Sequence, residues 1–190
     1  MKIAKDCALI VVDVQNDFVV GSLAVPGALE IIPTINKYIE KFEKAGAPIF
    51  FTRDYHPPNH CSFLENGGKW PRHCVQGSFG AEFYKDLKIP KDVTVIAKGT
   101  DPTKEAYSGF DGTYLESELR SKGIKKVFVC GLATDYCVKA TVLDALARGF
   151  ETYLLEDASK AVNLMPEDGK KAILEMIEKG AKVINLKELE

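Results

Sequence analysis

Short apolar runs alternate with helical patterns along this chain, and this alternation limits the folds open to it. Six runs are predicted as strands, at residues 7–12, 48–52, 94–97, 127–130, 152–155 and 182–184. They are mostly apolar throughout instead of alternating between apolar and polar residues. Such strands are typical of a parallel sheet that is covered on both faces.

Helices are predicted between these strands. Residues 28–45 carry apolar side chains at helical spacing, and further helices are expected at 113–122, 137–148 and 167–179. A glycine follows each of these four segments and ends it. We therefore predict a single α/β domain, residues 1–190: a three-layer doubly wound domain with a mostly parallel six-stranded sheet covered by helices on both faces.

The composition is that of a globular protein, with 46% hydrophobic residues, 27% charged residues and a formal net charge of −2. Because there is no basic surplus, we expect neither nucleic acid nor membrane as a partner. No stretch approaches the ~20 apolar residues of a membrane span. The first apolar run meets Asp13 without a cleavage site, so it is not a signal peptide.

The five cysteines show no spacing typical of a disulfide framework. Reduced thiols and a cytoplasmic location are therefore expected. Cys61 and Cys74 flank a histidine-containing loop, and they could be metal ligands or a disulfide, although we rank both below the histidines.

Four reactive side chains stand where predicted strands end. Asp13, Asp54 and Lys98 each follow an apolar run, and Cys137 follows the fourth run after a break at Gly131. In open parallel sheets, ligands bind beyond the carboxyl ends of the strands near the point where strand order reverses. The sequence therefore predicts that these groups converge on one edge of the sheet.

Cys137 is predicted to lie in the first turn of a helix, with Thr134 and Asp135 as N-cap candidates. A thiol there faces unpaired backbone N–H groups, which favour the thiolate and could hold an oxyanion. Asp13 could take the thiol proton, and Lys98 could stabilise the charge. The alternatives are a small core residue for Cys137, a polar strand end or a helix cap for Asp13, and a solvated charge for Lys98.

All three histidines, His56, His60 and His73, lie in the long loop after the second strand. Asp54 and His56 are two residues apart, so their side chains project to the same side of an extended chain. With His73 they form a set of two nitrogens and one oxygen that suits a divalent metal ion, most simply zinc, with iron or manganese as alternatives. The other interpretation is that these loop histidines are structural or solvated. His60 is left open as a fourth ligand, a partner of a ligand or part of a pocket wall.

Aromatic side chains occur in the same regions of the chain. Phe18 follows the first strand, Trp70 lies in the histidine loop, and Tyr107 and Phe110 follow the third strand. A flat aromatic ligand would fit between such side chains, although each of them could equally fill the core beneath a long loop.

Together these segments resemble the nicotinamidases of the isochorismatase-like cysteine hydrolase superfamily. The similar segments follow the family order and are spread over most of the chain. They are VVDVQNDF (11–18), RDYHPPNHCSF (53–63), KWPRHC (69–74), AKGTDP (97–102), YSGF (107–110) and GLATDYCV (131–138).

The resemblance implies an isochorismatase-like fold and an enzyme that hydrolyses nicotinamide, and also pyrazinamide, through a thioester. It assigns the catalytic triad to Asp13, Lys98 and Cys137. It assigns the divalent metal to Asp54, His56 and His73.

The same resemblance implies further details of the site. Ala133 and Cys137 would supply the oxyanion-hole amides, with a cis peptide bond at Leu132–Ala133. Phe18 and Trp70 would enclose the pyridine ring, and Tyr107 would line the pocket. Tyr55 stands where many relatives have Trp, and Glu65 joins His60 as a ligand candidate left open.

Other functions remain to be weighed. An isochorismatase or a carbamoyl amidase would typically lack the metal set. A dinucleotide-binding module would need a glycine-rich turn after the first strand, and residues 12–16 contain no glycine. A metal or redox sensor would leave Asp13 and Lys98 unexplained. The expected partner is a small-molecule substrate, and a homo-oligomer is left open.

Overall fold

The structure of the chain, a computed structural model, describes all residues from 1 to 190. Its centre is one sheet of six strands in the order β3-β2-β1-β4-β5-β6. Every neighbouring pair is parallel, so the sheet predicted as mostly parallel is wholly parallel. The strands are β1 Cys7–Val12, β2 Ile49–Asp54, β3 Thr94–Lys98, β4 Lys126–Leu132, β5 Glu151–Lys160 and β6 Lys182–Ile184.

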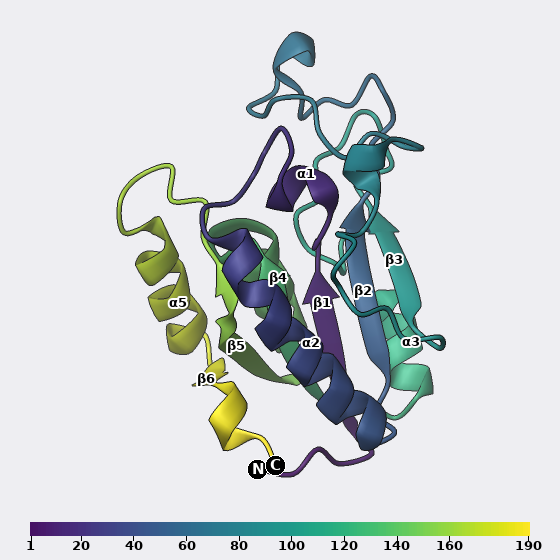
Figure 1. Cartoon of the computed structure of the whole chain (residues 1–190), viewed down its shortest axis with the longest axis vertical. Helices are drawn as coiled ribbons and strands as arrows, with labels where there is room; N and C mark the ends of the chain where they lie inside the picture. Colours follow the sequence, from purple (N-terminus) through teal and green to yellow (C-terminus); the bar gives the residue numbers. More distant parts are fainter.

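Helices cover both faces of this sheet, which confirms the α/β class (Figure 1). Helix α2 crosses one face, and α3, α4 and α5 pack on the other. The α-helices are α1 Asn16–Val19, α2 Ala28–Lys44, α3 Leu115–Ser121, α4 Lys139–Ala147 and α5 Asp168–Glu178. Short 3-10 helices occupy Leu64–Asn66, Phe79–Ala81 and Leu186–Glu188, and a π-helical turn occupies Thr134–Val138.

Strand β1 explains why the apolar runs are continuous. Its side chains point alternately to the two faces, and both faces are core. Leu9 and Val11 pack on the α2 side, whereas Ile10 and Val12 pack on the side of α3, α4 and α5. All four are at most 1% exposed, so a polar residue at any of them would lose its water on either face.

The strand order reverses between β1 and β4, which are hydrogen-bonded neighbours at the centre of the sheet. Their connections leave to opposite sides at this point, and the carboxyl ends of both strands face the same edge. The loops that rise above this edge in Figure 1 belong largely to residues 55–93 between β2 and β3. The topology therefore builds one site from the ends of β1, β2, β3 and β4.

The helix predicted to start at Cys137 was placed two residues too early. Helix α4 begins at Lys139, after the π-helical turn. Thr134 and Asp135 are also not N-caps, because the partner of Thr134 lies in the last part of β5 and the partners of Asp135 lie just after this strand. The Thr134 hydroxyl lies 2.6 Å from that of Ser159, and the Asp135 carboxylate accepts hydrogen bonds from two backbone N–H groups in residues 162–163, each at 2.9 Å.

Strand β5 is longer than the predicted run at 152–155. It continues to Lys160 because a register shift near Gly131 lets its polar second half pair with the end of β4. Exposed side chains such as Glu156 interrupt the apolar pattern there, so the sequence gives no sign of the extension. None of the helices combines the length and the apolar character that a membrane crossing requires.

A side chain at Gly131 would test how closely β4 packs against β1. Its φ is 114°, and a Cβ there would lie 2.2 Å from the carbonyl oxygen of Val12 in the neighbouring strand. We expect Gly131→Ala to lower the free energy of unfolding by about 3 kcal/mol or more, measured by urea titration. Gly123→Ala is the matched control: φ is 69° with open space around it, so the expected loss is about 1 kcal/mol. Equal losses would contradict the proposed clash.

Candidate active site

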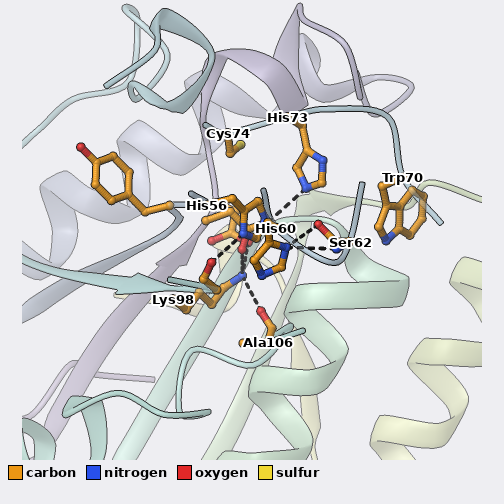
Figure 2. A network of polar contacts seen from close by, with 12 residues as sticks. His56, His60, Ser62, Trp70, His73, Cys74, Lys98 and Ala106 are labelled. Carbon is orange, nitrogen blue, oxygen red and sulfur yellow. Dashed lines mark hydrogen bonds and ion pairs between the residues drawn. The ribbon is translucent and has the colours of Figure 1, made fainter. Parts of the chain in front are cut away.

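A buried ammonium group lies at the centre of the site. Lys98 ends β3, is 1% exposed, and its Nζ lies 2.8 Å from Asp13 Oδ2. The same Nζ is paired with Asp54 Oδ1 and lies 3.4 Å from Cys137 Sγ and 3.4 Å from the carbonyl oxygen of Ala106. Four segments of the chain therefore meet at one cation, and Figure 2 shows Lys98 beneath the histidines with its contact to Ala106.

The charges of this cluster follow from its geometry. Burial by itself opposes the ammonium, but the carboxylates of Asp13 and Asp54 raise the pKa of Lys98 well above its usual range. Burial likewise opposes the Asp54 carboxylate, yet Lys98 and the neighbouring histidines hold the pKa of Asp54 well below its usual range. Lys98 and Asp54 are therefore a charged pair.

Asp13 has a different environment. Burial raises its pKa above the ordinary value for aspartate, although Lys98 opposes this rise. Thr52 donates a hydrogen bond of 2.7 Å to Oδ1 and so fixes the orientation of the carboxylate. A carboxylate of raised pKa beside a thiol is suited to accept and return a proton.

The surroundings of Cys137 favour the neutral thiol, in contrast to the expectation that they favour the thiolate. Burial raises the pKa of Cys137 well above its usual range; the Lys98 ammonium opposes this rise, and the Asp13 and Asp54 carboxylates add to it. The π-helical turn also replaces the α-helical first turn that had been expected. Removal of the thiol proton therefore needs a base, and an Asp13 carboxylate oxygen lies within 4.8 Å of the sulfur.

The backbone beside the thiol has the form that the resemblance implied. The Leu132–Ala133 peptide bond is cis. Ala133 and Cys137 both line the same cavity, where their backbone could face a bound carbonyl group.

The second oxygen of Asp54, Oδ2, lies close to one ring nitrogen of His56 and one of His73. His56 Nδ1 lies 2.7 Å from the carbonyl oxygen of Gly99, and His73 Nδ1 lies 2.7 Å from that of Pro71. Each Nδ1 must carry the proton in these bonds, so each Nε2 of the neutral ring presents a lone pair. These Nε2 atoms face Asp54 Oδ2 at 3.5 and 3.8 Å.

This arrangement fits a metal ion. Buried His56 Nε2 has no hydrogen-bond partner, and two imidazole nitrogens with a carboxylate oxygen are a donor set typical of zinc. The ligand atoms of Asp54, His56 and His73 all lie within 4.8 Å of one another. Backbone carbonyls that fix the ring tautomer are the usual support of metal-binding histidines.

His60, which the sequence left open, is engaged elsewhere. Its Nδ1 lies 2.7 Å from Ser62 Oγ, its Nε2 lies 3.0 Å from the carbonyl oxygen of Lys104, and its ring stacks on His56 at 4.0 Å (Figure 2). With both nitrogens occupied, His60 supports the His56 ring instead of offering a lone pair. Glu65 forms an exposed ion pair with Arg72.

All five cysteines are free thiols, so Cys61 and Cys74 are not paired. Cys74 is held by its backbone instead, because its N–H donates to the Asp17 carboxylate at 2.8 Å. This bond ties the segment that follows His73 to helix α1, which carries Phe18.

A cavity adjoins the Cys137 thiol and His73. The predicted aromatic residues Phe18, Trp70 and Tyr107 all line it, and Trp70 Nε1 donates a 3.0 Å hydrogen bond to the Tyr107 hydroxyl. Phe110 does not line it, because this side chain stacks on Phe150 in the core. The cavity is also lined by Leu132 of the cis peptide bond and by residues that the sequence did not single out, namely Leu23, Val25, Glu105, Tyr136 and Val162.

Gln15 was also missed. Its side-chain oxygen accepts a 2.9 Å hydrogen bond from the Asp54 N–H, and its side-chain nitrogen donates to the Asp54 carbonyl at 2.8 Å. The residue fixes the end of β2 from the end of β1. The only signal in the sequence is an amide side chain two residues after a strand-end aspartate.

The fold and this site define the chain as an isochorismatase-like α/β hydrolase. Its sequence matches the Isochorismatase domain family over residues 7–188, and the chain belongs to that family.

Individual relatives give a narrower picture. The chain is 37% identical to the nicotinamidase of Escherichia coli strain K12, over an alignment of 205 residues that covers 96% of each chain. The pyrazinamidase of Pyrococcus horikoshii in complex with zinc is 54% identical, with a TM-score of 0.92 over 95% of this chain and 99% of the other. PnC1 from L. infantum in complex with nicotinate is 36% identical, with a TM-score of 0.93 over 100% and 98%. The resemblance to nicotinamidases is therefore confirmed.

The different roles of His56 and His60 lead to a paired test. We expect His56→Phe to lower metal affinity by at least about tenfold, because a ligand is lost. His60→Phe keeps an aromatic ring against His56 and should retain most of the metal. Metal content after dialysis, measured by elemental analysis, compares the two variants. Equal losses would make His60 a ligand.

Proposed function

We propose that this chain is a metal-containing amidohydrolase that converts nicotinamide and water to nicotinate and ammonia, and that also hydrolyses pyrazinamide. The observation that carries the proposal is a cavity lined by Cys137, Asp54 and His73. Behind these residues lie the buried Asp13 and Lys98, which adjoin the thiol, and His56, which completes the histidine–carboxylate set. The nicotinamidase and pyrazinamidase relatives support the same substrate class.

In the proposed first step, Asp13 takes the proton of Cys137. The thiolate, stabilised by the Lys98 ammonium 3.4 Å from the sulfur, attacks the amide carbonyl carbon. The backbone N–H groups of Ala133 and Cys137 would hold the oxyanion of the tetrahedral intermediate.

Asp13, now protonated, donates its proton to the leaving nitrogen, so that ammonia departs and a thioester to Cys137 remains. Asp13 then takes a proton from the attacking water, and the acid is released as the C–S bond breaks. The same proton returns to the Cys137 sulfur, which restores the neutral thiol. The raised pKa of Asp13 suits this repeated uptake and release of a proton.

We assign a divalent metal, zinc before iron or manganese, to Asp54, His56 and His73; when bound it would supply a Lewis-acid contact for the ring nitrogen. The aromatic side chains of Phe18 and Trp70 would enclose the ring, and Tyr107 would hold Trp70 in place. The ring is thereby oriented with its carboxamide toward Cys137.

The second candidate is another hydrolase of the same superfamily, such as a carbamoyl amidase or an isochorismatase. The histidine–carboxylate set beside the thiol favours a ligand with a metal-binding ring nitrogen, and so favours nicotinamide. We further propose that residues 1–190 form a single domain and that the enzyme works in the cytoplasm without nucleic acid or membrane partners. A homo-oligomer stays open. Ammonia release from nicotinamide, with and without a chelator, is the direct test of the activity.

The nucleophile can be tested by Cys137→Ala. This change should abolish ammonia release but leave the fold and the metal content intact, because it removes the sulfur and no metal ligand. The measurements are ammonia release, circular dichroism and elemental analysis. Near-normal turnover would end the covalent proposal.

The roles of the base and the cation predict two further losses. Asp13→Asn keeps the shape but loses the base, and Lys98→Met loses the cation beside the sulfur. We expect kcat to fall by at least about 100-fold in each variant. Because Lys98 is buried between carboxylates, thermal unfolding must be measured alongside kinetics. A folded Lys98→Met protein with wild-type kcat would show that the ammonium plays no part in the reaction.

The proposed contact between the metal and the ring nitrogen of the substrate predicts a preference for nicotinamide over benzamide. Benzamide lacks that nitrogen, so its kcat/KM should lie well below that of nicotinamide. His73→Ala should narrow this gap by impairing nicotinamide hydrolysis selectively, while Cys137 still reacts with a small thiol reagent. The kcat/KM of both amides is compared in both proteins, with metal content checked. Equal hydrolysis by the metal-loaded wild type would contradict the proposed contact.

A further inference from the structure

Three aromatic side chains from separate segments form one wall of the cavity. Trp70 comes from the loop after β2, Tyr107 from the segment after β3, and Tyr136 from the π-helical turn after β4. The rings of Trp70 and Tyr136 meet edge to face at 4.9 Å, and those of Tyr107 and Tyr136 lie 5.6 Å apart. The hydrogen bond from Trp70 to Tyr107 links the remaining pair.

Lys69 lies across two of these rings on their solvent side. Its Nζ donates a 2.9 Å hydrogen bond to the Tyr136 hydroxyl and lies 4.8 Å from the ring centroids of both Trp70 and Tyr136. Lys69 is exposed, Tyr136 is half-buried and Trp70 is 6% exposed. Lys69 is therefore the outermost member of the group and does not itself line the cavity.

We propose that Lys69 and Tyr136 form a clasp over the cavity mouth that restricts the substrate to amides of a single six-membered ring. The clasp joins the loop of Trp70 to the turn of Cys137, so both sides of the mouth are held by one ammonium group. This inference rests on the proposed function and narrows its substrate class.

The physical reason is where a larger ring would extend. The nitrogen and the carboxamide of the substrate face the inner wall at His73 and Cys137, which leaves the opposite ring edge for the mouth. A ring fused at that edge must separate Trp70 from Tyr136. Such a movement breaks both cation–π contacts and the hydrogen bond of Lys69. A substrate with a single ring can bind without this movement.

Quinoline-3-carboxamide is a suitable probe, because it keeps the nitrogen meta to the amide and adds one fused ring. The measured quantity is its kcat/KM relative to that of nicotinamide. We expect Lys69→Ala and Tyr136→Phe each to raise this ratio by about three- to tenfold, the effect of losing a cation–π contact or a hydrogen bond near the surface. Lys69→Arg retains a cation and donors and should keep the wild-type ratio.

Lys85→Ala is the matched control, because Lys85 is an exposed lysine outside the cavity. It should leave the ratio unchanged. An unchanged ratio in both Lys69→Ala and Tyr136→Phe overturns the clasp, as does an equal rise in Lys85→Ala.

Trp70 supplies a readout that does not depend on catalysis, because it is the only tryptophan in the chain. Acrylamide should quench its fluorescence more strongly in Lys69→Ala than in the wild type or Lys85→Ala. Trp70 fluorescence also measures the relative binding of nicotinate and quinoline-3-carboxylate. The clasp predicts that Lys69→Ala shifts this binding ratio toward the fused ring.

These readouts separate the two proposals. If the wild type does not release ammonia from nicotinamide, the proposed function fails and the binding ratio decides on the clasp. If neither acid binds, equal acrylamide quenching in the wild type and Lys69→Ala overturns the clasp. If ammonia is released but neither ratio responds to Lys69→Ala, only the clasp is overturned.

Discussion

The site depends on one interaction, the pairing of a buried ammonium with two carboxylates. Lys98 contacts both Asp13 and Asp54, and all three side chains are almost fully buried. Charges removed from water are strongly destabilising unless they are paired, so loss of either carboxylate leaves the lysine with only one partner of opposite charge. Strand register supplies the pairing, because Asp54 and Lys98 are direct partners across β2 and β3, and β1 lies beside β2. The register of the parallel sheet therefore brings the opposite charges together and offsets the free-energy cost of burying them.

Asp54 connects the charge cluster around Lys98 with the histidine set, so a change of charge in one affects the other. One of its oxygens faces Lys98, and the other faces the two histidines. A cation bound by Oδ2 would draw on the same carboxylate charge that stabilises Lys98, so metal binding and the charge near the thiol are linked. Gln15 holds the backbone of Asp54 on both sides. The raised pKa of Cys137 follows first from burial, which the Lys98 ammonium opposes and the two carboxylates reinforce.

Much of the site could be predicted because reactive side chains at strand ends share an edge in any parallel sheet. Asp13, Asp54 and Lys98 needed only correct strand ends, and the histidines needed only their common loop. The resting state of Cys137 could not be predicted in this way. Its pKa depends on burial and on charges from other strands, whereas the sequence indicated only a helix start. Gln15 and Tyr136 were missed because their partners lie far away along the chain.

The sequence by itself determined the wholly buried strands, the helices between them and the set of groups that the sheet edge would hold. The spacing of apolar residues and the positions of glycines are local properties of the chain, so they can be recognised without a structure. The tertiary structure alone decided how those groups are used. His60 became a support for His56 because Ser62 and Lys104 occupy its nitrogens, and Thr134 and Asp135 bind the segment around the end of β5 instead of capping α4. Such choices depend on which polar groups meet in space, and chain order does not encode that directly.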